Sequence, residues 1–348
     1  MNTIWSDVRF AWRALRRAPG STCAAALTLA VGIGACAAVF AVLYSVLLRP
    51  LPFRQAGRLV TLSNTIPASG VAAFPFSQPE LFALRADAAA FEALAAYVPA
   101  SLNLRDEGPA ERVPGARVSA NFFDVLGAPP LLGRAFDADA DRPGAECDVV
   151  ARHGYWVERL GGDVSALGRT LTIDAAPCRL IGVMPPDFRL PASADLWVPA
   201  VFPAASMGRE GLGRQMYRVI GRLADGVTPE QASGIIGEAA RRFYAEHPDF
   251  YSGNPWRIVM VPLRDQVVGD VGTTLAVLMA AVAAMFLITC ANVAHLILSR
   301  LLGREREFVL RSALGAGRRR LATQVLTECV LISLAGSAAG LWLASQAV

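Results

Sequence analysis

The sequence predicts an α-helical membrane protein with three transmembrane segments and a large mixed α/β extracytoplasmic domain inserted between the first and the second. Hydrophobic residues make up 54% of the 348 residues and charged residues only 18%, which is too apolar for an ordinary soluble domain. Three stretches reach the roughly 20 apolar residues that cross a bilayer. The long interval between the first two stretches carries strand and helix patterns instead.

A cytoplasmic amphipathic helix lying on the membrane surface is predicted for residues 1–20. Trp5, Val8, Trp12 and Leu15 recur at helical steps, and arginines occupy the other faces. This pattern places the indole rings at the level of the lipid headgroups. A positively charged leader is the alternative interpretation of the same residues.

The first transmembrane helix is predicted for residues 21–48, which contain no Asp, Glu, Lys or Arg. A cleaved secretory signal competes with this interpretation, because "IGAC" at Ile33 to Cys36 is similar to a lipoprotein cleavage site. A signal has an apolar region of about 7 to 15 residues, whereas this run continues well beyond Cys36. Its length therefore favours a retained span.

Arginine placement predicts the orientation of the chain. Four arginines precede the first span, and seven lie within residues 300–320. Short arginine-rich flanks stay in the cytoplasm. Residues 49–270 are therefore predicted to lie outside as a periplasmic domain, which is long enough to build its own core.

The predicted outer domain mixes strand and helix patterns. "RLVTLS" and "YRVIGRL" predict strands, and "RTLTIDAAPCRLIGVMP" alternates in the manner of a hairpin around Asp174 to Pro177. Residues 77–97 predict a helix, because apolar side chains follow helical spacing from Leu81 to Ala95. Another helix is predicted to begin after Thr228 as its N-cap, with Pro229 at the first helical position.

Residues 271–299 and 321–348 are predicted as the second and third transmembrane helices, joined by a cytoplasmic loop at residues 300–320. In the third, Gly336 and Gly340 have the fourfold spacing that allows close helix packing in lipid. Chance occurrence in an alanine-rich chain is the alternative.

Two polar side chains stand near the start of the third span. Gln324 and Glu328 are four residues apart on one helical face, so we expect them to point at another helix or at the inner interface. Charge within hydrocarbon is costly. Snorkelling of Glu328 toward the headgroups remains the alternative.

No catalytic, cofactor-binding or metal-binding residue is predicted on this chain. It contains no lysine, which excludes the GxxxxGK[ST] phosphate loop. The acidic string Asp137 to Asp141 lacks the glycine and glutamate of a calcium loop and predicts a solvated turn. Cys147 and Cys178 are the cysteines of the outer domain, where an oxidising compartment makes them a candidate disulfide.

Several segments carry a resemblance to a known family, among them "SANFFDVLGAPPLLGRAF", "GVMPPDF", "RLADGVTPEQA" and "REREFVLRSALGAG". With them the chain resembles bacterial ABC transporter permeases of the MacB and FtsX-like type, above all those in which the module is duplicated. The resemblance implies four membrane helices in the inner (cytoplasmic) membrane and a MacB-like periplasmic core domain between the first two. The third span ends at Val348, so we interpret the chain as a fragment or a truncated gene product with an incomplete FtsX-like permease domain.

The resemblance also implies partners. A separate cytoplasmic ABC ATPase subunit would bind ATP and Mg, so the chain itself is expected not to be an enzyme. A second permease module (a homodimer or a duplicated half), a periplasmic adaptor and membrane lipid are the other expected partners, and nucleic acid is not one. The expected function is to transmit ATP-driven motion to the periplasmic domain for export. The alternative is a non-transporting, membrane-anchored module for mechanical signalling or scaffolding that binds a periplasmic partner.

The cytoplasmic loop is predicted to contain a coupling helix that docks on the ATPase. An apolar patch framed by charges suits docking, and the same order of residues occurs in the cytoplasmic loop of similar permeases. The ATPase-coupling residues are predicted to be Arg306, Glu307, Phe308, Arg311 and Leu314. The alternative is that the arginines only fix topology and bind anionic lipid.

Overall fold

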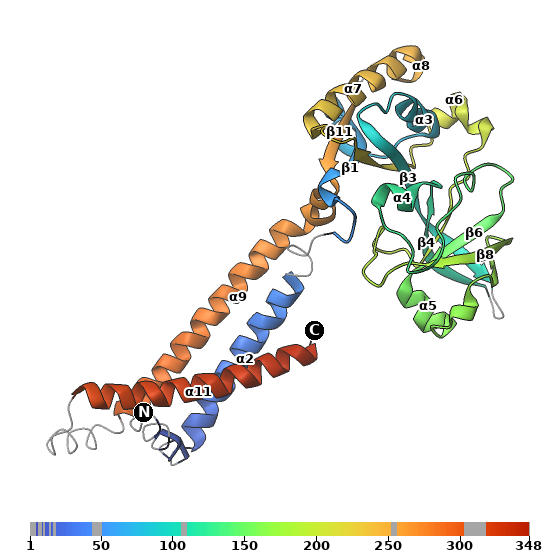
Figure 1. The fold of residues 1–348 in the computed structure, drawn as a ribbon. Helices are drawn as coiled ribbons and strands as arrows, with labels where there is room; N and C mark the ends of the chain where they lie inside the picture. The colour runs from blue at the N-terminus through green and yellow to red at the C-terminus, as the bar shows by residue number, and fades with distance from the viewer. Residues whose placement is uncertain are drawn as a thin grey trace. The chain divides into compact units, whose positions relative to one another are not determined.

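The computed structural model describes residues 5, 9, 11–13, 15–16, 19–43, 51–105, 110–251, 256–302 and 318–347 (Figure 1). The chain divides into two compact units. Met1–Arg49 and Val268–Val348 form the first, which we call the membrane unit, and Pro50–Val267 form the second, which we call the outer domain.

Three long helices dominate the described part of the membrane unit, namely α2 (Pro19–Leu43), α9 (Leu263–Leu302, which begins in the outer domain) and α11 (Arg318–Ala347). Each contains a segment long and apolar enough to cross a membrane, at Thr22–Ala41, Val277–Ser299 and Val325–Gln346. Large apolar side chains such as Leu27, Leu287 and Leu334 remain exposed on them. A helix that is apolar on every side needs lipid or another helix as its surroundings.

The described residues between positions 5 and 16 are helical. Trp5 and Trp12 are 68% and 55% exposed, whereas Ala11 and Leu15 are buried. That this helix lies on a membrane surface stays a prediction.

A single mixed sheet of eleven strands forms the frame of the outer domain, counted over its described residues. The strands on its main path, in spatial order, are β11 (Arg257–Pro262), β1 (Leu59–Ile66), β10 (Arg218–Leu223), β3 (Phe91–Arg105), β4 (Glu111–Val118), β9 (Leu196–Pro199), β6 (Cys147–Ala151), β8 (Ala176–Val183) and β5 (Leu132–Gly133). Off this path, β2 (Val71–Phe74) pairs with β1, and β7 (Thr170–Ile173) pairs with β3 and β8. Most pairs are antiparallel, and β4–β9 and β6–β8 are parallel.

The long strand β3 joins the two ends of this sheet. Its first half pairs with β10, its second half pairs with β4, and its last residues also pair with β7. Helices α3 (Gln78–Ala86) and α7 (Pro229–Glu246) lie at the β1–β10 end, and α5 (His153–Leu160) lies near β6 and β8 (Figure 1). The shorter helices are α4 (Phe122–Leu126), α6 (Arg209–Leu212) and α8 (Pro248–Tyr251).

Local signals in the sequence correctly predicted several of these elements. β1 and β10 occupy the two predicted strands, and β7 and β8 form the predicted hairpin, with Asp174 and Ala175 at positive φ in its turn. Thr228 caps α7 by accepting a hydrogen bond from the backbone N–H of Gln231, and Pro229 is the first helical residue. Cap and turn chemistry depends on adjacent residues only, which explains the agreement.

The prediction of one helix over residues 77–97 was wrong in its second half. α3 ends at Ala86, and Phe91, Leu94 and Ala95 belong to β3. The alanine-rich run has high intrinsic helix propensity. Pairing of this part of β3 with β10 outweighs that propensity.

Three hydrophobic clusters stabilise the outer domain. The first gathers α4 and the rings of Phe123, Phe188 and Trp197, whose centroids lie 5.2–6.0 Å apart. The second packs α3 and α7 on the sheet through residues such as Leu81 and Ile236. A third lies beneath α5 and the β7–β8 hairpin. Because aromatic pairs at such distances add to the energy of burial, the first cluster firmly positions α4 and the segment that leads into it.

Candidate functional site

The predicted ATPase-coupling residues lie outside the described residues. Positions 303–317 are not described, and they include Arg306, Glu307, Phe308, Arg311 and Leu314. The next described residue is Arg318, where α11 begins. The coupling helix therefore stays a prediction.

The two glycines predicted to pack helices lie against α2. A Cβ added to Gly336 would come within 2.7 Å of the Cβ of Leu29, and one on Gly340 within 2.7 Å of the carbonyl oxygen of Ala30. Across the same contact, a Cβ on Gly34 would lie 3.0 Å from the carbonyl oxygen of Gly340. Only residues without a side chain permit this approach of the α2 and α11 backbones. In Figure 1, α11 crosses α2.

A contact between α2 and α9 also depends on a glycine, and the sequence did not single it out. A Cβ on Gly32 would lie 2.5 Å from Oγ1 of Thr289. The Thr289 hydroxyl donates to the carbonyl oxygen of Met285 on its own helix at 2.9 Å. Thiol Sγ of Cys36 lies 3.8 Å from the carbonyl oxygen of Val282. The helix α2 thus packs on both α9 and α11.

Glu328 lies inside the membrane unit and is 6% exposed. The backbone of Gln324 is part of α11, and its side chain is outside the described atoms. Burial of a carboxyl group in a span demands a polar partner or a water-filled surrounding. That Gln324 and Glu328 point at another helix or at the inner interface stays a prediction.

A disulfide joins Cys147 on β6 to Cys178 on β8. The two residues are register partners in the parallel β6–β8 pair, with Cα atoms 4.4 Å apart. The bond links two segments of the outer domain separated by 31 positions. It therefore fixes the register of β6 against the β7–β8 hairpin.

Each acidic residue at the alternating positions of the string Asp137 to Asp141 has its own partner in the protein. Asp137 pairs with Arg134 and Asp139 with Arg142, each at 2.9 Å, while Asp141 accepts a hydrogen bond from the backbone N–H of Ala120 at 3.0 Å. Within the described ranges, no group of three or more His, Cys, Asp or Glu side chains is placed to hold a metal ion.

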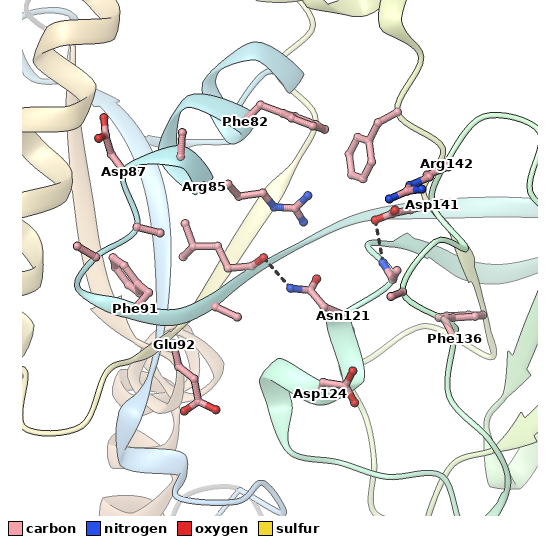
Figure 2. A pocket seen from close by; sticks show the side chains of 18 of the residues that line it. Phe82, Arg85, Asp87, Phe91, Glu92, Asn121, Asp124, Phe136, Asp141 and Arg142 are labelled. Carbon is pink, nitrogen blue, oxygen red and sulfur yellow. Dashed lines mark hydrogen bonds between the residues drawn. The ribbon is translucent and has the colours of Figure 1, made fainter.

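A cavity of about 970 Å³ opens in the outer domain between α3, the start of β3, the segment before α4 and residues 136–143 (Figure 2). Arg85, from the last turn of α3, extends into it. The guanidinium carbon of Arg85 lies 5.7 Å from the ring centroid of Phe82 and 5.5 Å from that of Phe202. These distances are typical of cation–π contacts. Burial lowers the pKa of Arg85, and the nearby carboxylate of Asp141 partly offsets this effect.

The cap of α3 is a buried polar cluster, close in sequence to this cavity. Glu80, 2% exposed, accepts hydrogen bonds from the backbone N–H and hydroxyl of Ser77 at 2.7 and 2.8 Å and from Nδ2 of Asn64 at 3.0 Å. The Tyr244 hydroxyl on α7 donates to Oδ1 of Asn64 at 2.9 Å. Burial raises the pKa of Glu80 above its ordinary value, and the hydrogen bonds from Ser77 oppose that rise. The pattern "SQPE" is the capping-box signal by which the sequence could have indicated this cluster.

The architecture defines a class of protein: apolar spanning helices packed through glycines, with a folded α/β domain between the first and the second. Residues 22–239 match the MacB-like periplasmic core domain, and residues 279–347 match the FtsX-like permease C-terminal domain. The chain belongs to the family of MacB-like permeases and is a multi-pass membrane protein with a periplasmic domain.

Related proteins share about a quarter of their aligned residues with this chain. The macrolide export ATP-binding/permease protein MacB of Bordetella avium is 29% identical over 231 residues, covering 65% of this chain and 33% of that protein. The pyoverdine export ATP-binding/permease protein PvdT of Pseudomonas fluorescens is 27% identical over 229 residues, covering 64% of this chain and 33% of that protein. The chain thus spans about a third of these relatives, and their ATPase portion lies outside the match.

Among solved structures, the chain was matched to the periplasmic region of MacB from Actinobacillus actinomycetemcomitans. It has a TM-score of 0.45 and 15% identity, covering 62% of this chain and 94% of that one. The extracellular domain of the ABC-type transporter YknZ from Gram-positive bacteria has a TM-score of 0.41 and 17% identity. This match covers 58% of this chain and 99% of that one.

Proposed function

We propose that this chain is the transmembrane subunit of an export transporter in which a partner ATPase drives motion of the periplasmic outer domain. The observation that carries the proposal is the course of α9. Its first residue, Leu263, is 2% exposed in the main core cluster of the outer domain, and its last, Leu302, directly precedes the arginine-rich loop. A helix is stiff along its axis because every internal turn is hydrogen-bonded. Displacement of the loop is therefore passed along α9 toward the outer domain.

The packing of α2 supports the same mechanism. α2 is the other helix that leads into the outer domain along the chain, and it packs on α11 through Gly34 and Gly340 and on α9 through Gly32. Close-packed helices shift as bodies rather than deform. A push on the loop between α9 and α11 is thus delivered to both helices that flank the outer domain in sequence.

Export rather than signalling is favoured by the relatives, since MacB of Bordetella avium and PvdT of Pseudomonas fluorescens are both named as export ATP-binding/permease proteins. Their names also combine ATP binding with the permease. For this chain we assign ATP and Mg binding to a separate cytoplasmic ABC subunit, which docks on Arg306, Glu307, Phe308, Arg311 and Leu314.

The docking assignment is tested in the complete permease reconstituted with its ATPase. Phe308→Asp removes the apolar contact and Glu307→Arg reverses a charge, so each is expected to lower complex formation and permease-dependent ATP hydrolysis with insertion unchanged. Arg319→Gln, a change in the basic run at the start of α11, is the matched control and is expected to have little effect. Normal binding and hydrolysis in both loop variants would leave the arginines with a topological role only.

A further inference from the structure

The cavity of the outer domain contains the guanidinium group of Arg85, which is oriented toward the open space. Arg85 extends into the space, and the rings of Phe82 and Phe202 cover it at 5.7 and 5.5 Å from its guanidinium carbon. These contacts engage the π-faces of the rings and leave the guanidinium N–H groups to other partners. No residue in the described part of the chain accepts a hydrogen bond from Arg85. A partly buried guanidinium with this surrounding gains from a charge-assisted acceptor.

Most other charged groups around the cavity already have partners. Asp87 pairs with Arg242 at 2.9 Å, and Glu92 pairs with Arg58 at 3.0 Å. Arg142 pairs with Asp139 at 2.9 Å. Within the described lining, Arg85 is therefore the cation best placed to bind an incoming anion.

Asp141 is the group that competes with such an anion. It interacts electrostatically with Arg85, but its Oδ2 accepts the backbone N–H of Ala120 at 3.0 Å, and no hydrogen bond or ion pair joins it to Arg85 among the described residues. Figure 2 shows Asp141 facing the same space as Arg85. The Asp141 carboxylate is thus held near the guanidinium without occupying its N–H groups.

The remaining walls are mixed: polar side chains, among them Asn121 and Asp124, lie beside apolar ones around a wide space. Four phenylalanines line the cavity, Phe82, Phe91, Phe136 and Phe202, together with several alanines. A volume of about 970 Å³ lies at the upper end of the range for small-molecule sites, roughly 300 to 1,000 Å³. Aromatic walls favour a flat apolar body, and the planar fork of an arginine fits a carboxylate through two parallel hydrogen bonds.

We propose that this cavity binds a small amphipathic carboxylate, with its carboxylate on the N–H groups of Arg85 and its apolar body between the phenylalanines. The proposal concerns the outer domain alone and holds whether or not the chain couples to an ATPase. The proposal also predicts the effect of Asp141 on affinity. Its carboxylate repels the carboxylate of the ligand, so a neutral side chain at this position strengthens binding.

The test uses the full chain in phosphatidylcholine nanodiscs, with 2-naphthoate as the probe and equilibrium dialysis as the readout. Empty nanodiscs give the blank for lipid partition. The neutral isostere 2-naphthamide is expected to bind at least about tenfold more weakly than 2-naphthoate, since it cannot make a charge-assisted pair. Arg85→Gln is expected to lower the affinity for 2-naphthoate by a similar factor and to leave that for 2-naphthamide nearly unchanged.

Two further variants make the result decisive. Arg112→Gln removes an exposed arginine of β4 that does not line the cavity. This variant should bind 2-naphthoate with the same affinity as the unmodified chain. Asp141→Asn keeps an oxygen for the Ala120 N–H and should tighten 2-naphthoate binding several-fold. Equal binding of naphthoate and naphthamide would overturn the proposal. If Arg85→Gln does not fold, an unchanged or weaker affinity in Asp141→Asn overturns it instead.

Discussion

Gly34 of α2 and Gly340 of α11 meet backbone to backbone, so that a Cβ on Gly34 would lie 3.0 Å from the carbonyl oxygen of Gly340. Gly340 likewise has no room for a side chain, because an added Cβ would lie 2.7 Å from the carbonyl oxygen of Ala30 on α2. This contact holds α11 against α2. A side chain added at Gly340 would push the two helices apart.

Gly340→Ala is expected to weaken the α2–α11 contact. The added methyl must displace a backbone carbonyl, and overpacking of this kind costs about 1 to 3 kcal/mol. The matched control is Gly237→Ala on α7, where a Cβ meets nothing within 4 Å. That change should stabilise the chain by roughly 0.5 to 1 kcal/mol, because alanine is the better helix former. Thermal unfolding in detergent measures both, and a rise of the melting temperature in both variants would contradict the packing account.

The buried carboxyl group of Glu80 predicts a pH dependence of stability. Because its pKa in the folded chain is raised above the ordinary value of 4.5, the folded state holds a proton over a pH range in which the unfolded state has lost it. The free energy of unfolding is therefore highest below that ordinary value and falls as the pH rises through the folded-state pKa.

Glu80→Gln should remove this part of the pH dependence, whereas Glu238→Gln, at an exposed position on α7, should retain it. Denaturant unfolding from pH 4 to pH 8 provides the comparison. Parallel pH profiles for unmodified protein and Glu80→Gln would show that Glu80 is not the group responsible.

The Cys147–Cys178 disulfide is expected to stabilise the outer domain by restricting its unfolded chain. For a separation of 31 positions, the loop-closure estimate is about 3.7 kcal/mol. The double variant Cys147→Ala, Cys178→Ala should have a free energy of unfolding lower by that amount, and its unfolding midpoint should lie at a lower denaturant concentration. A reducing agent should lower the midpoint of the unmodified protein and leave that of the double variant unchanged. Replacement of the helix cysteines Cys23 and Cys290, which are free, is the control. Identical unfolding midpoints with and without reductant would mean that the bond contributes nothing.

Sequence alone predicted those parts of the fold that depend on local chemistry or on simple apolar length. The spans needed only a run of apolar residues, and the start of α7 needed only Thr228 and Pro229. Phe91 and Leu94 were misassigned to a helix, because β10, the strand that pairs with them, comes from a distant part of the chain. A local pattern carries no information about such partners.

The cavity was missed for the same physical reason. Arg85 and Phe82 are three residues apart on one helix and could have been paired from their spacing. Phe202 and Asp141 reach the cavity from segments far along the chain, and only the folded sheet brings them to α3. By contrast, the spacing of Gly336 and Gly340 was a usable signal, since close packing of helices depends on small residues at regular intervals.

Transmission of motion along α9 is the central claim, and its continuity between the core of the outer domain and the cytoplasmic loop can be altered by substitution. Asp270→Gly with Val271→Gly softens the helix before its apolar span, while Asp270→Ala with Val271→Ala gives the same truncation with a stiff backbone. Glycine destabilises a helix interior by about 1 kcal/mol per residue relative to alanine. The comparison therefore isolates helix stiffness from the loss of the two side chains.

The most direct measurement is energy transfer from a donor dye at Val157→Cys, on the exposed face of α5, to acceptor-labelled lipid, in the complete permease reconstituted with its ATPase. ATP is expected to change this transfer in the unmodified permease and in the alanine pair. In the glycine pair the change should largely disappear while ATP hydrolysis continues. An equal ATP-dependent change in the glycine and alanine pairs, or no change in the unmodified permease, would contradict transmission through α9.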